Sequence, residues 1–352
     1  MAGQNGGLSY RDSGVDIDAK NQAFDLMKGY VRSTFGPQVL SDFGTFGPMF
    51  ALGQAGSPLD QPVLVASADG VGTKLKIAFL LDRHDTVGID LVNHCVNDIL
   101  TTGAQPLFFL DYFATAKLQP ETVAQVVSGL ATACREAGCA LLGGETAEMP
   151  GFYMSGEYDL AGFIVGLVER NKAINGASIR PGDIAIGLPS SGLHTNGYSL
   201  VRRLFGLTND TPTADARRKL DTFFTDLDRT LGDELLIPHR SYLNALRPHL
   251  GRVKGLAHIT GGGLIDNTPR VLPSDVAVHF HPRLWSRPPI FDIIQALGRI
   301  DEQEMCRAFN VGIGMVAIAA PEEVDALLND LPDAVVIGEA TARGDGAAVF
   351  ID

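Results

Sequence analysis

Apolar residues recur along the chain with two alternating periods, one typical of helices and one typical of strands. Over residues 18–34 they recur at intervals of three and four, which places Phe24, Met27 and Val31 on one side of a predicted helix. A second helix is predicted over 120–137, where proline stands first and Gly138 follows the last position. The remaining elements predicted in the first half are strands at 63–67, 107–113, 139–142 and 158–168 and a helix at 90–102.

The second half continues this alternation after a polar, turn-like stretch at 169–181. Mixed strands and helices in two blocks are typical of α+β domains. We therefore expect an N-terminal domain over residues 1–170 and a C-terminal domain over 171–352. The elements predicted in the second half are strands at 183–188, 276–280, 314–319, 335–339 and 347–351 and helices at 198–205, 233–246, 290–299, 302–309 and 322–331.

Composition narrows the class of protein. The chain has 352 residues and a formal net charge of −13, from 28 basic and 41 acidic residues, so we expect no nucleic-acid partner. No apolar run reaches the roughly 18 residues of a membrane span. The first residues lack the pattern of a secretory signal, and the expected location is the cytoplasm. The four cysteines form no Cys-x-x-Cys pair, which favours buried, reduced thiols.

An acidic residue and a glycine-rich turn follow the predicted strand at 63–67. The segment Asp69-Gly-Val-Gly-Thr-Lys74 contains two glycines that let the backbone approach a ligand closely. Asp69 could ligate Mg²⁺, and Lys74 could neutralise phosphate charge. The segment is not a Walker A sequence, and a tight turn with a surface lysine explains the same residues.

The predicted helix at 90–102 carries a polar stripe. Asp90, His94 and Asp98 recur at intervals of four, so they lie on one face of the helix, with Asn97 beside Asp98. A polar stripe on an otherwise apolar helix faces either solvent or a site. Asparagine and aspartate form helices poorly, which favours a site at this end of the stripe.

Three further loops carry polar groups. Glu145 follows two glycines after a predicted strand and could point into a cleft or belong to a solvated turn. The loop 190–197 contains His194 and Asn196, which could move protons or cap the next helix. Thr260 and the three glycines after it precede another helix, where they could hold an anion or form a flexible connector.

These segments together resemble the phosphoribosylformylglycinamidine cyclo-ligase (AIR synthetase) family nearly end to end. The resemblance implies ATP-dependent cyclisation of formylglycinamidine ribonucleotide to aminoimidazole ribonucleotide through an iminophosphate, with release of ADP and phosphate. It also implies Mg²⁺ and a homodimer whose N-terminal strands form a barrel across the interface. The segments that carry the resemblance are 8–18, 69–74, 90–98, 103–112, 143–150, 190–197 and 258–263.

The resemblance also implies roles for individual residues. The catalytic residues would be Lys28, Asp98, His194 and Asn196. The nucleotide would contact Gly44, Gly47, Asp69, Gly70, Val71, Gly72, Thr73 and Lys74. The substrate would contact Thr260, Gly261, Gly262 and Gly263. The Mg²⁺ ligands would be Asp69, Asp98 and Glu145, with Asp90 and Asn97 as further candidates.

Two other functions remain open at this point. One is another ATP-dependent enzyme of the same superfamily, similar to thiamine-monophosphate kinase, although such an enzyme would lack the pattern at 190–197. The other is a non-catalytic relative that binds nucleotide without turnover. The charged residues at 69, 98, 145 and 194 favour an active enzyme.

Overall fold

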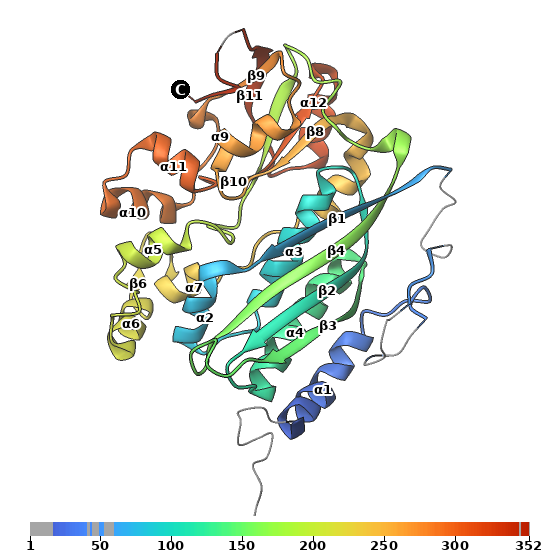
Figure 1. The fold of residues 1–352 in the computed structure, drawn as a ribbon. Helices are drawn as coiled ribbons and strands as arrows, with labels where there is room; N and C mark the ends of the chain where they lie inside the picture. Colours follow the sequence, from blue (N-terminus) through green and yellow to red (C-terminus); the bar gives the residue numbers. More distant parts are fainter. Residues whose placement is uncertain (1–16, 41–42, 44–48, 53–59, 345, 352) are drawn as a thin grey trace, which may run out of the picture.

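The computed structural model describes residues 17–40, 43, 49–52, 60–344 and 346–351. In this part of the chain, two mixed sheets are formed one after the other along the sequence (Figure 1). The predicted mixed α/β fold class is confirmed. None of the described helices is long and apolar enough to cross a membrane.

The first sheet has the strand order β1-β4-β2-β3. β2 and β3 run parallel, and the other pairs are antiparallel. Helices α3 and α4 pack against each other and lie behind the sheet as drawn in Figure 1, and α1 packs on α4 beside the β3 edge, at the lower right. The elements are α1 (Ile17–Arg32), β1 (Pro62–Gly70), α3 (Val87–Leu100), β2 (Gln105–Thr115), α4 (Pro120–Ala137), β3 (Ala140–Glu148) and β4 (Tyr158–Glu169).

Close contact between α3 and α4 depends on two glycines. A Cβ at Gly88 would lie 2.3 Å from the carbonyl oxygen of Val126, and one at Gly129 would lie 2.3 Å from that of Asp85. Larger side chains at either position would push the helices apart. The glycines therefore hold α3 in place, and α3 carries the polar stripe.

The faces of β1 differ in polarity. Leu64 and its neighbours at alternate positions are exposed on one face, while Val65, Ser67 and Asp69 turn toward the helices. Asp69 pairs with Gly162 on β4, which places its carboxylate on the same side as α3.

The second sheet has the order β12-β9-β11-β5-β10-β8, and strand β10, which lies between β5 and the edge strand β8, is buried along its whole length. Its strands are β5 (Ile184–Pro189), β8 (Val253–His258), β9 (Val276–Phe280), β10 (Ile313–Ala319), β11 (Val335–Ala342) and β12 (Val349–Ile351). A two-stranded ribbon is formed by β6 (Phe223–Phe224) and β7 (Arg229–Thr230).

Short helices connect and cover these strands. The α-helices are α2 (Leu75–Leu81), α5 (Tyr198–Leu204), α6 (Thr213–Leu220), α7 (Leu231–Leu235), α8 (Leu243–Leu246), α9 (Gly263–Asn267), α10 (Pro289–Gly298), α11 (Glu302–Ala308) and α12 (Pro321–Asp330). The 3₁₀ turns are η2 (Gly72–Lys74), η3 (Arg170–Lys172), η4 (Arg247–Arg252), η5 (Thr268–Val271) and η6 (Pro282–Leu284).

Three sequence predictions need correction. The helix predicted over 233–246 is two short helices, α7 and α8, separated by an extended segment around Pro238, which has no N–H to donate. The strand predicted at 139–142 continues to Glu148, so Glu145 lies within β3 and not in a turn. Strand β8 was not predicted at all, although its apolar residues are buried.

Candidate active site

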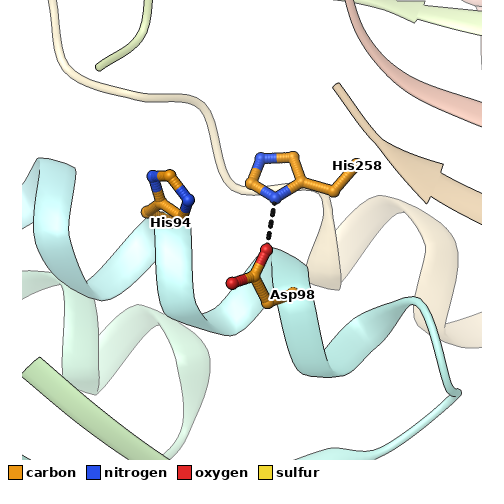
Figure 2. Close-up of side chains that lie close together, drawn as sticks. All are labelled: His94, Asp98 and His258. Carbon is orange, nitrogen blue, oxygen red and sulfur yellow. Dashed lines mark hydrogen bonds and ion pairs between the residues drawn. The ribbon is translucent and has the colours of Figure 1, made fainter. Parts of the chain in front are cut away.

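Carboxylates and imidazoles from both halves of the chain meet around α3. Asp69 comes from β1, His94 and Asp98 come from α3, and His258 comes from the end of β8. Asp69 Oδ2 lies 2.7 Å from His94 Nε2, and Asp98 Oδ1 lies 2.8 Å from His258 Nδ1. Figure 2 shows the ring of His258 above the Asp98 carboxylate and the ring of His94 one helical turn away. The site therefore forms only when the two halves pack together.

A second set of side chains orients this cluster. The Ser67 hydroxyl donates to Asp98 Oδ2 at 2.8 Å. The hydroxyl of Thr195 lies 2.9 Å from His94 Nδ1, and His239 Nε2 lies 3.0 Å from His258 Nε2. Both ring nitrogens of His94 and of His258 therefore have a hydrogen-bond partner.

The charges in the cluster shift its pKa values. Burial alone would disfavour ionisation of His94, but its hydrogen bond to Asp69 and the nearby negative charges raise its pKa. Burial similarly opposes ionisation of Asp69 and Asp98, yet hydrogen bonds and attraction from His94 and His258 lower the pKa of both carboxyl groups. Burial is the largest cause that lowers the pKa of His258. The cluster therefore keeps both carboxylates ionised at neutral pH.

The rest of the α3 stripe binds backbone from the second half. Asp90 Oδ1 accepts the His239 N–H at 2.7 Å, and Asn93 Nδ2 donates to the His239 carbonyl at 2.7 Å. Asn97 donates to the Arg240 carbonyl at 2.8 Å and accepts the Tyr242 N–H at 2.9 Å. Asp90 and Asn97, expected as possible metal ligands, are both buried. The Asn97 amide and Asp90 Oδ1 make these bonds, whereas none of the described residues offers Asp90 Oδ2 a hydrogen-bond partner.

Lys74 has a different position from the one expected of a phosphate-binding lysine. It is fully buried, and its ammonium group donates to Asp90 Oδ1 at 2.8 Å, to the Ile237 carbonyl at 2.7 Å and to the His194 carbonyl at 3.3 Å. Three acceptors use all three ammonium hydrogens. No hydrogen remains for a phosphate, so Lys74 holds segments together in this arrangement.

The turn before Lys74 is open. Gly72 has a φ of +70°, where glycine is favoured, and both Gly72 and Thr73 are exposed. Gly70 is half-buried and Val71 is buried, and the Thr73 hydroxyl lies 3.1 Å from that of Ser199. The exposed backbone of this turn lies directly beyond Asp69.

The loop that carries His194 and Asn196 lies beside the cluster. His194 has a φ of +59°, its ring stacks on His239 with 3.9 Å between centroids, and its Nε2 accepts the Ser191 N–H at 3.1 Å. Burial lowers its pKa well below the ordinary value, so the ring is neutral. His194 Nδ1 and Asn196 Nδ2 are both buried, and none of the described residues offers either atom a hydrogen-bond partner.

The glycines after Thr260 lie against this loop. A Cβ at Gly261 would be 3.2 Å from Asn196 Oδ1. Asn267 Nδ2 donates to the carbonyl oxygens of Thr260, Gly261 and Gly263, at 3.4, 3.2 and 2.9 Å. Gly262 and Gly263 both have positive φ. The fold thus brings Asn196 next to the predicted substrate loop 260–263, and Asn267 holds the backbone of that loop.

Other predicted residues lie apart from the cluster. Across the first sheet, Asp69 is aligned with Gly162, Asp111 and Gly144 on the neighbouring strands. Glu145 is aligned with Tyr112 and belongs to the next row of cross-strand pairs. Adjacent rows point to opposite faces of a sheet, so within one chain Glu145 faces away from Asp69. Lys28 is exposed on α1, which packs against α4 and β3. Gly44 and Gly47 lie outside the described residues.

His239 and Ser67 were not predicted as members of the site. Ser67 lies two residues before Asp69 on the same face of β1, which strand alternation could have indicated. His239 lies in the segment interpreted as a helix, so its side chain was not expected to point at α3.

Comparisons with known proteins agree with this arrangement. Family models match at residues 56–168 (AIR synthase related protein, N-terminal domain) and at residues 180–351 (AIR synthase related protein, C-terminal domain). A phosphoribosylformylglycinamidine cyclo-ligase of Desulfitobacterium hafniense is 51% identical over 348 residues, covering 97% of this chain and 99% of the relative. The chain belongs to the AIR synthase related family. Another member, the cyclo-ligase of Geobacillus thermodenitrificans, is 52% identical over 349 residues and 97% of each chain.

Solved structures with the same fold are more distant. A thiamine-monophosphate kinase from Stenotrophomonas maltophilia has a TM-score of 0.64 at 18% identity, covering 94% of this chain and 96% of that one. A hydrogenase maturation protein HypE in complex with ATP has a TM-score of 0.62 at 19% identity, covering 97% and 93%. At these identities, the likeness shows that the family fold is shared.

Proposed function

We propose that this member of the family closes the imidazole ring of aminoimidazole ribonucleotide, using ATP to activate the amide oxygen of formylglycinamidine ribonucleotide. The observation that carries the proposal is the pair of ionised carboxylates, Asp69 and Asp98, held together at the open turn 70–73. The names of the relatives at 51% and 52% identity support this reaction, and the ATP-bound neighbour supports nucleotide binding.

Asp69 and Asp98 fit the needs of a Mg²⁺ ion. Their side chains are 39% and 29% exposed. A histidine contacts one oxygen of each carboxylate, and the other oxygen accepts one hydrogen bond, from the Gly70 N–H in Asp69 and from the Ser67 hydroxyl in Asp98. Mg²⁺ binds one or two carboxylates together with waters and phosphate oxygens. When bound, the ion would offset charge on the transferred phosphoryl group. The exposed backbone at Gly72 and Thr73 would contact the phosphates.

The loops opposite the carboxylates would hold the substrate. His194 Nδ1 and Asn196 Nδ2 lack protein partners, and we assign them to the reacting amide. The neutral His194 ring would donate one hydrogen bond there, since its Nε2 already accepts from Ser191. The turn 260–263, next to Asn196, would position the rest of the substrate, so that the two reacting ends of one molecule stay close.

We also propose that the chain is a homodimer that pairs through the open face of the first sheet, forming the expected barrel between two copies. Leu64 is 58% exposed and Phe163 is 48% exposed on this face, and β1 and β4 are adjacent. Clustered exposed apolar side chains on a sheet face are typical of an interface. Glu145 shares this face and stays a predicted site residue that would act across the interface. Lys28 on α1 stays a predicted catalytic residue.

The experiment is an assay of the purified protein with ATP, Mg²⁺ and formylglycinamidine ribonucleotide. We expect ADP and aminoimidazole ribonucleotide in equal amounts. ADP formation with thiamine monophosphate but not with formylglycinamidine ribonucleotide would overturn the proposal in favour of a kinase. ATP binding without ADP release on either substrate would identify a non-catalytic relative.

A further inference from the structure

The histidines of the cluster form a group of donors that the proposed reaction does not require. One ligand atom each from His94, Asp98 and His258 lie within 4.8 Å of one another, and the two histidines are buried. Ligands of one small cation must lie about 3.0–3.5 Å apart when each bond is about 2.1 Å, so a small inward movement closes the set. Figure 2 shows all three side chains converging between α3 and the end of β8.

The outer contacts match those of ligating histidines. A histidine that binds a metal through one ring nitrogen usually holds a hydrogen bond at the other, which fixes the ring. Thr195 lies 2.9 Å from His94 Nδ1, so a cation would bind at Nε2, in place of the proton between Nε2 and Asp69. His239 lies 3.0 Å from His258 Nε2, so a cation would bind at Nδ1, in place of the proton between Nδ1 and Asp98 Oδ1. Ser67 donates to the second oxygen of Asp98. Each of the three side chains is therefore oriented by a hydrogen bond at an atom that would not bind the cation.

The chemistry of the donors selects the cation. Mg²⁺ prefers oxygen ligands, whereas imidazole nitrogen suits Zn²⁺ and other late first-row cations. We propose that His94, Asp98 and His258 form a site for a divalent transition-metal cation of the Zn²⁺ class, with Asp69, 2.7 Å from His94, as a fourth donor. This site shares Asp69 and Asp98 with the proposed Mg²⁺ site but does not depend on the proposed reaction.

The direct test is metal binding by the full-length protein after chelator treatment. Zn²⁺ is titrated by equilibrium dialysis with elemental analysis, and Co²⁺ is followed by its visible absorption bands. We expect one equivalent of Zn²⁺ that a large excess of Mg²⁺ does not displace. The Co²⁺ spectrum should lack thiolate charge-transfer bands, because all four cysteines are buried and none belongs to the cluster.

Variants separate this site from adventitious binding. His94→Gln and His258→Gln should each weaken Zn²⁺ binding at least tenfold, and Thr195→Val, which leaves every ligand in place, should weaken it by about 10- to 100-fold. His279→Gln is the matched control, because its ring lies 4.9 Å from that of His281 and this pair could also bind Zn²⁺. Its binding should be unchanged.

Three results would overturn the proposal. They are the absence of Zn²⁺ binding in the wild-type protein, binding that Mg²⁺ displaces equally well, and binding that survives both cluster variants or is lost in His279→Gln. Circular dichroism of each metal-free variant shows whether it is folded. If a histidine variant is unfolded, the wild-type Co²⁺ spectrum and Thr195→Val still decide the question.

Discussion

Lys74 and Asp90 form an ion pair that is closed to solvent, with 2.8 Å between Nζ and Oδ1 and both side chains fully buried. Burial lowers the pKa of Lys74 and raises that of Asp90, and their mutual attraction opposes both shifts. Since Asp90 Oδ1 also accepts the His239 N–H, this one oxygen joins the turn after β1, helix α3 and the segment between α7 and α8. The pair is a structural centre beside the candidate active site.

Lys74→Met should destabilise the protein strongly. It leaves a buried carboxylate without its cation, which costs about 3–5 kcal/mol in the free energy of unfolding. Urea denaturation measures this change. Lys76→Met is the matched control, because Lys76 pairs with Glu157 at a partly exposed position, where the loss should be about 0–1 kcal/mol. Equal effects of the two variants would contradict the structural role of Lys74.

Asp98→Asn should lower kcat by about 10²-fold or more, because it removes a charge expected to stabilise the transferring phosphoryl group through Mg²⁺. Steady-state ADP release with formylglycinamidine ribonucleotide measures the change. Asp325→Asn, at an exposed position of α12, should leave kcat unchanged. A nearly normal kcat in Asp98→Asn would exclude a role for this carboxylate in the reaction.

His194 should make stability depend on pH below about 6.5. Burial lowers the pKa of His194 in the folded protein well below the ordinary histidine value of 6.5, so the unfolded chain binds more protons in this range. The contribution of the neutral ring to the free energy of unfolding is therefore fully present above pH 6.5. It is lost as the pH falls, by up to about 1.4 kcal/mol per pH unit. Asparagine tolerates the positive φ at this position, so His194→Asn should fold and show a shallower fall in unfolding free energy between pH 6.5 and 5. Parallel curves for the two proteins would contradict the assignment.

Two glycines in the predicted substrate loop should respond differently to alanine. Gly263 has a φ of +59°, and its Cβ would lie 1.8 Å from the Cys306 carbonyl oxygen, so Gly263→Ala should destabilise the protein by at least about 1 kcal/mol. Gly261 is exposed and its Cβ would meet only Asn196 Oδ1, at 3.2 Å. Gly261→Ala should therefore keep its thermal stability and raise KM for the substrate. A KM equal to that of the wild type would remove Gly261 from the binding loop.

Phe163→Glu should convert the dimer into a monomer, because it places a charge in the centre of the open sheet face. Size-exclusion chromatography with light scattering measures the mass of the particle. Leu297→Glu, at a similarly exposed apolar position on α10, is the matched control and should remain a dimer. A wild-type protein that is already monomeric would contradict the proposed assembly.

The sequence predicted those elements whose ends have local signals. Helix α4 was placed without error because proline opens it and Gly138 closes it with a φ of +72°. Strand β9 was also placed without error. The prediction of one helix over 233–246 was wrong because α7 and α8 both have helical spacing. The break at Pro238 depends on contacts with α3, which is distant in sequence.

Only those site residues that stand out within a single segment of the chain could be predicted from the sequence. Asp69, His94 and Asp98 stand out because polar residues follow a strand or share one face of an apolar helix. The contact of Asp98 with His258 spans 160 positions, and a periodic pattern holds no information at that range. The burial of Lys74 was likewise invisible, because a lysine after a glycine turn has the same local sequence whether it faces solvent or a distant carbonyl.

The polar stripe of α3 also has a consequence for how the protein unfolds. Asp90, Asn93 and Asn97 satisfy backbone groups at 239–242, and these bonds exist only when both halves of the chain are present. A fragment that ends between the two family matches, after residue 168, would expose an apolar helix with unpaired amides at its centre. The two halves should therefore melt in a single cooperative transition, and the boundary seen in the sequence separates two patterns of residues but not two independently stable bodies.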